Sequence, residues 1–142
     1  MASLRQHLTK KGYKRIKLDP VGTGHLKFEA RINGVSGEFI LDTGASNTCI
    51  GFEDLEHFKL FAEESEVKAA GAGAIDMLTQ ISQDNLIEID NWSTKEVAIV
   101  LFDLSHVNQA LINHEANPVS GIIGADILKK GKAVIDYQYN CL

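Results

Sequence analysis

Residues 39–46 read Phe39-Ile40-Leu41-Asp42-Thr43-Gly44-Ala45-Ser46, an apolar run that ends on an acid and continues into a turn. An acid in this position is unusual, because a charge beside a protein core costs free energy unless hydrogen bonds or nearby charges stabilise it. The Thr43 hydroxyl and the backbone N–H of Gly44 are donors that could supply such bonds. Asp42 is therefore expected either to be satisfied within a local turn or to take part in chemistry.

Two alternating runs lead up to this stretch. Apolar residues occupy every second position of residues 26–32, with charged residues between them, which is typical of a half-buried strand. Asn33-Gly34 suits the positive φ angles of a tight hairpin turn, and the alternation resumes over residues 35–41. Asp42 is thus expected at the end of the second strand of a hairpin.

Short strands and turns continue along the chain. Apolar residues at 86–89 and 97–102 flank a turn-rich segment and predict a second hairpin, and small residues at 67–75 predict a third. Residues 121–123 are expected to form a buried strand that leads into a helical turn. The remaining expectations are strands at 14–18 and 133–137, a loop at 19–24, and short helices at 4–11, 52–59 and 104–113.

These elements predict a single mostly-β domain over residues 1–142, with residues 1–12 as an N-terminal helix or extension. Seven or eight short strands with two or three small helices favour a barrel or a sandwich. A chain of 142 residues is long enough to bury, on folding, about two-thirds of the surface that its unfolded form exposes. With 44% hydrophobic and 23% charged residues, its composition is that of an ordinary globular protein.

Charge and composition exclude several classes of protein. The net charge of -5 argues against general nucleic-acid binding. The basic residues at 10–17 are expected to form a solvated face or to protect an edge strand, with a local anionic contact as the alternative. No apolar run reaches the roughly 18 residues that span a bilayer and no signal peptide is found, so no membrane contact and a cytoplasmic location are expected. The five histidines lack metal-ligand spacing, and Cys49 and Cys141 are expected to be free thiols.

The order of motifs along the chain is more specific than Asp-Thr-Gly alone, which would also suit a capped turn. Asp42-Thr43-Gly44 is followed by the glycine-rich segment Ala70-Gly71-Ala72-Gly73 and later by Gly121-Ile122-Ile123-Gly124-Ala125-Asp126-Ile127-Leu128. With these motifs and Gly34, residues 13–137 resemble the retroviral-type, or retropepsin-like, aspartic proteases. The resemblance is greatest to the non-viral, single-domain branch.

The resemblance implies a closed β-barrel-like fold with one lobe per chain and one catalytic aspartate per lobe. A two-lobed monomeric protease would need a second Asp-Thr-Gly and roughly twice the length, neither of which this chain has. Asp42 would therefore pair with Asp42 of a second copy in a homodimer. The pair would act as an aspartic endopeptidase, activating a water that attacks a peptide bond, without a cofactor or a metal.

The resemblance also assigns roles to three sets of residues around Asp42. The active-site loop would consist of Thr43, Gly44, Ala45 and Ser46, with the Gly44 N–H holding an Asp42 oxygen and Thr43 bonding across the dimer. The flap over the substrate would contain Ala70, Gly71, Ala72 and Gly73. The inner strand beneath the site would contain Ile122, Ile123 and Gly124.

One position departs from the retroviral pattern. Retroviral members carry an arginine after the glycine of the inner strand and use it at the dimer interface, whereas this chain has Ala125. The dimer must then be held in a different way. Asp126 matches the polar residue that follows in the family and is expected to cap a helix rather than to act in catalysis.

Two other functions are considered. A non-catalytic homodimer of the same fold, which binds peptides or scaffolds a complex, stays open as an alternative because an intact aspartate does not by itself prove turnover. Phosphoryl transfer through an aspartyl-phosphate is disfavoured. Such a site would need strands that alternate with long helices and a second acid two residues after the first, where this chain has Gly44.

Overall fold

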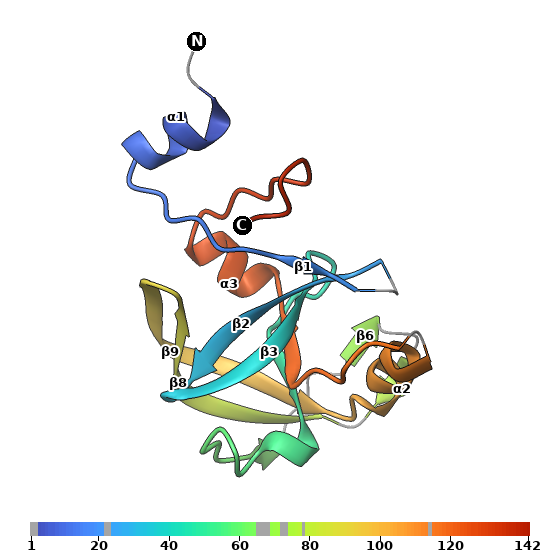
Figure 1. Ribbon diagram of the computed structural model, residues 1–142. Helices are drawn as coiled ribbons and strands as arrows, with labels where there is room; N and C mark the ends of the chain where they lie inside the picture. The colour runs from blue at the N-terminus through green and yellow to red at the C-terminus, as the bar shows by residue number, and fades with distance from the viewer. Residues whose placement is uncertain (1–2, 22–23, 65–68, 72–73, 78, 114) are drawn as a thin grey trace.

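A computed structural model describes residues 3–21, 24–64, 69–71, 74–77, 79–113 and 115–142 (Figure 1). The helices are α1 (Leu4–Lys10), α2 (Ser105–Asn113) and α3 (Ala125–Lys130), with one short 3-10 helix, η1 (Phe52–Asp54). The strands are β1 (Asp19–Pro20), β2 (Leu26–Ile32), β3 (Val35–Leu41), β4 (Cys49–Gly51), β5 (Glu63–Glu64), β6 (Ala69–Gly71), β7 (Ala74–Met77), β8 (Gln80–Ile89), β9 (Trp92–Phe102) and β10 (Gly121–Ile123).

Six of these strands close into a barrel. Their order is β2, β3, β10, β4, β9 and β8, and β8 pairs back onto β2. β1 extends the sheet beside β2, and β5 extends it beside β8. Closure leaves no open edge along the barrel wall. The predicted mostly-β, closed barrel-like fold with short helices is confirmed.

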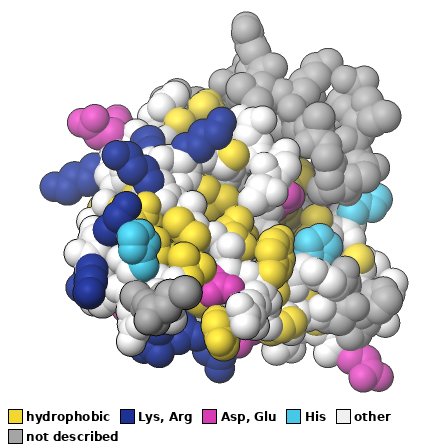
Figure 2. Space-filling view, turned by 90° about the horizontal axis from the view of Figure 1, so that it is seen from above, with side chains coloured by type: hydrophobic (Ala, Val, Ile, Leu, Met, Phe, Trp, Pro, Cys, Tyr) yellow, Lys and Arg dark blue, Asp and Glu magenta, His cyan; other side chains and the backbone are white. Residues whose placement is uncertain are grey.

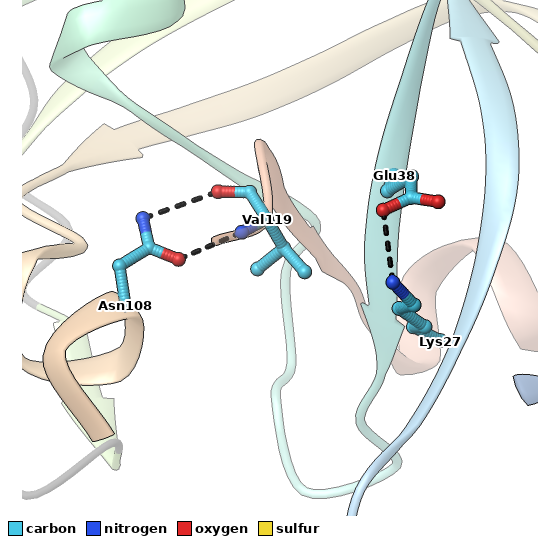
Figure 3. A network of polar contacts seen from close by, with 4 residues as sticks. All are labelled: Lys27, Glu38, Asn108 and Val119. Carbon is cyan, nitrogen blue, oxygen red and sulfur yellow. Dashed lines mark hydrogen bonds and ion pairs between the residues drawn. The ribbon is translucent and has the colours of Figure 1, made fainter. Parts of the chain in front are cut away.

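The first hairpin forms at the predicted dipeptide. β2 and β3 pair antiparallel along their whole length, and the turn residues Asn33 and Gly34 have φ angles of 51° and 84°. Such left-handed values are what a two-residue hairpin turn needs, and asparagine and glycine tolerate them best. An ion pair of 3.0 Å between Lys27 and Glu38 also joins the two strands (Figure 3).

β10 lies between β3 and β4 in the barrel wall. It runs parallel to β3 and antiparallel to β4, so it fills the space between them. Gly121 at its start has no room for a side chain, because a Cβ there would overlap the Cys49 carbonyl oxygen. Asn108 of α2 fixes the approach to β10: its side chain donates to the Val119 carbonyl oxygen at 3.2 Å and accepts from the Val119 N–H at 2.8 Å (Figure 3).

The strands around β10 are buried on both faces. The core inside the barrel takes alternate residues from them, namely Phe39, Leu41, Ile50, Ile99, Leu101 and Ile123. A second core lies on the outer face and takes their neighbours Ile40, Cys49, Val100, Phe102 and Ile122, together with Leu111 of α2. Burial on both faces explains why these strands read as continuous apolar runs instead of alternating ones.

The predicted strands near the two ends of the chain differ from the structure. The strand expected at 133–137 is wrong, because Asp136 pairs only with Cys141 in an isolated bridge. The Asp136 carboxylate accepts hydrogen bonds from two backbone N–H groups that follow it, which favours a turn over a strand. Residues 14–18 make a single bridge to the same cysteine, and Asp19–Pro20 forms a strand inside the predicted loop.

The helix expected at 52–59 is also wrong in extent. Only Phe52–Asp54 is helical, in the 3-10 form, and turns follow. Phe58 is fully buried, and its ring lies so close to Gly37 that a Cβ there would be 2.6 Å from it. Packing of this ring against β3 thus replaces the regular amphipathic face that the spacing predicted. No helix in the described ranges is long and apolar enough to cross a membrane.

We expect Ile99→Ala to lower the free energy of unfolding by about 2–5 kcal/mol, because Ile99 is fully buried in the barrel and its truncation leaves a cavity. Ile112→Ala is the matched control, since Ile112 is 52% exposed on α2, and it should change stability by no more than about 0.5 kcal/mol. Urea denaturation followed by circular dichroism measures both values. Equal losses for the two variants would contradict this core.

Candidate active site

Asp42 directly follows β3, at the point where the strand leaves the barrel wall. Its backbone N–H donates to the Ile123 carbonyl oxygen at 3.1 Å, which continues the parallel ladder in which Leu41 pairs with Ile123. The Asp42 side chain is half-buried, whereas Ile122 and Ile123 beneath the loop are buried. The carboxylate therefore lies at the edge of the core, held by β10 and accessible to water.

The turn after Asp42 holds its carboxylate in place. The Gly44 N–H donates to Asp42 Oδ1 at 2.9 Å, and the Ala45 N–H donates to the Asp42 carbonyl oxygen at 3.3 Å. A Cβ at Gly44 would lie 3.3 Å from the same Oδ1, so a larger residue would crowd the carboxylate. Thr43 and Ser46, on either side of this turn, are exposed.

Gly124, directly after β10, lies where two backbone segments cross. A Cβ at this position would be 2.7 Å from the Ala45 carbonyl oxygen and 2.9 Å from that of Asn47. The next residue, Ala125, donates its N–H to the Ala45 carbonyl oxygen at 2.7 Å. Glycine is thus required here, and the loop of Asp42 rests directly on the start of α3.

Thr48 ties the same loop to the chain beyond β10. It is fully buried, and its Oγ1 accepts the Gly124 N–H at 3.1 Å and donates to Asp126 Oδ1 at 2.8 Å. The expected role of Asp126 as a helix cap is wrong, because Gly124 is the N-cap of α3 and the carboxylate accepts the Thr48 hydroxyl instead. The only signal for Thr48 in the sequence is a hydroxyl at the start of an apolar run, where burial demands a partner.

Cys49 follows Thr48 and is buried close to two carboxylates. The pKa of its thiol is raised to about 12, mainly by burial and then by the negative charges of Asp126 and Asp42. The thiol donates to the Asn47 carbonyl oxygen at 3.1 Å. Because the reactive form of cysteine is the thiolate, Cys49 at neutral pH is a packing residue rather than a nucleophile.

The predicted flap is described in part. β6 and β7 pair antiparallel as a separate two-stranded sheet, in agreement with the hairpin predicted from the small residues. Ala70 and Gly71 lie in β6, whereas Ala72 and Gly73 lie outside the described residues. In the view of Figure 1, β6 is on the same side of the barrel as α2.

The described residues hold neither a metal-ligand cluster nor a disulfide. Among the described residues, no group of three or more His, Cys, Asp or Glu side chains is arranged to hold a metal ion. Cys49 and Cys141 are both free thiols. The chemical groups assembled around the loop are thus one carboxylate, its backbone donors and the hydroxyls of Thr43 and Ser46.

A known protein family matches most of this chain. The model of the family described as "Aspartyl protease" matches residues 28–127. That range begins in β2 and ends in α3, so it contains the Asp42 loop, the β6–β7 hairpin and β10. A search of curated protein sequences gives no significant match.

Solved structures with a similar fold include three proteases or protease-like domains. The EIAV protease complexed with the inhibitor HBY-793 has a TM-score of 0.59 at 18% identity, over 78% of this chain and 90% of that chain. A retropepsin-like aspartic protease from Rickettsia conorii has a TM-score of 0.56 at 20% identity, over 87% and 82%. The retroviral protease-like domain of Ddi1 from Leishmania major has 0.54 at 22%, over 82% and 85%. At such identities the likeness is one of fold.

We expect Thr48→Val to lower the free energy of unfolding by about 1–3 kcal/mol, because it leaves the buried Gly124 N–H without its acceptor. The substitution keeps the shape of the side chain. Thr94→Val is the matched control: Thr94 is half-buried in β9, its hydroxyl has no partner among the described residues, and a change within about 0.5 kcal/mol is expected. Urea denaturation measures the free energy of unfolding of both variants. Similar losses would show that the bond between the Thr48 hydroxyl and the Gly124 N–H does not stabilise the fold.

The raised pKa of Cys49 predicts a loss of stability at high pH. The unfolded thiol loses its proton near its ordinary value of 9.0, whereas the folded thiol keeps it to about 12. Between these two values folding must return a proton to the thiol, so stability is complete below the lower one and falls as pH rises through the range. Cys49→Ala should lose less stability than the native chain between about pH 8 and pH 10. The urea midpoint of unfolding is measured for both proteins at these pH values. An equal fall of the midpoint in the two proteins would contradict this prediction.

Proposed function

The chain belongs to the aspartyl protease family, and we propose that it is an aspartic endopeptidase in which Asp42 carries the catalysis. The observation that supports this proposal is the placement of the Asp42 carboxylate. Asp42 follows β3, its carboxylate accepts the Gly44 N–H, and its backbone N–H donates to the Ile123 carbonyl oxygen of β10. A half-buried acid with a fixed donor on one oxygen keeps its other oxygen for a water or a substrate.

The reaction needs two carboxylates, and we propose that Asp42 of a second copy supplies the other. Two carboxylates within hydrogen-bonding distance cannot both ionise, so they share one proton and titrate as a unit. The ionised carboxylate removes a proton from the attacking water, while the protonated one donates its proton to the carbonyl oxygen of the scissile bond. The resulting tetrahedral diol collapses when the carboxyl that took the water's proton gives it to the amine nitrogen and the other carboxylate removes a proton from a hydroxyl of the diol, so that the C–N bond breaks and the pair again holds one proton.

The residues after Asp42 would orient the pair. The Gly44 N–H would fix one oxygen of each carboxylate, and the exposed Thr43 hydroxyl would reach the loop of the partner copy. Ser46 is exposed as well and would contact the substrate or the second copy. Since Ala125 replaces the arginine of retroviral members, other contacts would hold the dimer.

The substrate would be an extended segment of a peptide or protein. Such a segment would bind between the two Asp42 loops and the two β6–β7 hairpins, whose backbone groups would pair with its own as an added strand. Closure of the hairpins would exclude water other than the nucleophile. No cofactor enters the proposed reaction.

Asp42→Asn is expected to reduce cleavage of a diverse peptide pool, followed by mass spectrometry between about pH 3 and pH 7, by at least about 10³-fold. Asp84→Asn is the matched control, because Asp84 is exposed on β8 and belongs to no part of the site. A second experiment mixes equal amounts of native and Asp42→Asn chains and allows their subunits to exchange. The mixture should keep about one quarter of the activity of the same total amount of native chain, since only pairs of two native chains hold two carboxylates.

Other outcomes of these assays point elsewhere. A mixture that keeps about one half of the activity would mean that each chain acts alone, which contradicts the shared site. Equal cleavage by the native chain and Asp42→Asn would remove Asp42 from the reaction. A dimer that binds peptides from the pool but cleaves none would favour the non-catalytic peptide-binding alternative.

A further inference from the structure

A groove runs between α1 and the last residues of the chain. Two adjoining cavities of about 510 and 270 Å³ form it, and they share Tyr13, Lys14, Val134 and Leu142 in their walls. Every residue that lines the larger cavity lies outside residues 28–127, the range matched by the protease family. No residue of the Asp42 loop lines either cavity. Proteolysis therefore does not account for this groove.

The walls of the groove are apolar and only partly covered. Leu4 and Leu8 lie one turn apart on α1 and both line the larger cavity. α1 has no buried residue, and Leu4 is 50% exposed. Across the groove Tyr139 is 63% exposed. A helix of seven residues gains little stability alone, so a ligand that covers this apolar side would be bound favourably.

The groove is positively charged, whereas the protein as a whole has a negative net charge. Its walls contain five cations, which are Arg5, Lys11, Lys14, Arg15 and Lys132. Among the described residues none of the five forms an ion pair. The one acid of the walls is Asp136, whose carboxylate already accepts the N–H groups of Gln138 and Tyr139.

The same contrast appears along the chain and on the surface. Residues 1–18 hold six of the 14 Lys and Arg residues and none of the 19 Asp and Glu residues, although the whole chain has a net charge of -5. Figure 2, seen from above the view of Figure 1, shows Lys and Arg side chains gathered along one side of this face, beside hydrophobic side chains and a few acidic ones. An anionic ligand with apolar groups would complement this surface.

Three kinds of occupant can be compared on these grounds. A second copy placed by two-fold symmetry on this groove would bring the same five cations against each other, which is repulsive. A flat bilayer would reach exposed Leu4 but not the recessed walls formed by Leu8 and Leu142, which are only partly exposed. Side chains of a peptide fit recesses of this size, and acidic residues beside them would meet the cations.

We propose that this groove binds an acidic segment of a partner protein, with apolar side chains inserted between α1 and residues 134–142 and carboxylates paired with Arg5, Lys14 and Arg15. The binding needs no catalysis at Asp42. A cleavage substrate that carried such a segment would be held at two places, but the groove would bind the segment in the same way without the active site.

A selection from random peptides tests the proposal. Phage-displayed peptides of twelve residues are selected on the full chain carrying Asp42→Asn, which prevents cleavage and leaves the groove unchanged. We expect the enriched peptides to combine Asp or Glu with Leu, Ile, Phe or Tyr. The strongest one, synthesised with a fluorescent label, should bind at least about 10-fold more weakly to the chain that also carries Lys14→Glu and Arg15→Glu. Leu8→Ala should weaken it as well.

The matched control replaces Lys59 and Lys95 with glutamate. Both are exposed, neither lines the groove, and the change in net charge is the same, so binding should stay within about two-fold of the parent. Enriched peptides without acidic residues, or equal weakening by both double variants, would overturn the proposal. So would binding to phosphatidylglycerol vesicles with the same dependence on Lys14 and Arg15, or an oligomeric state that changes in the Lys14→Glu and Arg15→Glu chain. Each of these results leaves the cleavage assay of Asp42 unaffected.

Discussion

One buried hydroxyl joins the three segments on which the loop of Asp42 depends. Thr48 lies at the end of this loop, and its oxygen contacts the Gly124 N–H after β10 and the Asp126 carboxylate of α3. The Ala45 carbonyl oxygen adds a second bond to the same corner through the N–H of Ala125. The bond between Thr48 and the Gly124 N–H is buried, so breaking it leaves a polar group away from water. The position of Asp42 is thus fixed from below as well as by its own turn.

The barrel explains how an acid can follow an apolar strand. β3 is buried on both faces at its end, since the inner core takes Leu41 and the outer core takes Ile40. Asp42 comes one residue later, where the wall ends and its side chain is half-buried. The Gly44 N–H replaces part of the water that the carboxylate loses. The acid that directly follows an apolar run in the sequence is therefore a consequence of where β3 ends.

Much of this arrangement could be predicted from the sequence, because it follows from local patterns. Alternation and Asn33-Gly34 predicted the first hairpin, and the Asp42 loop and β10 followed from their motifs. The bond between Thr48 and Asp126 could not be predicted, since the two residues are 78 positions apart and no pattern links them. The turn at Asp136 depends on side-chain hydrogen bonds that compete with a strand of the same composition. In the proposed dimer the second carboxylate would come from another molecule, about which the periodicity of one chain carries no information.

The position of β10 between β3 and β4 also has a consequence for synthesis of the protein. β3 and β4 leave the ribosome early, whereas the strand that separates them, Gly121–Ile123, is the last strand of the described chain. Until it emerges, both earlier strands present unpaired edges, which are prone to aggregation and to capture by chaperones. Closure of the barrel is then a late and non-local event, slower than the formation of its hairpins. The strand that gives Asp42 a rigid floor thus delays the native fold until nearly the whole domain has been translated.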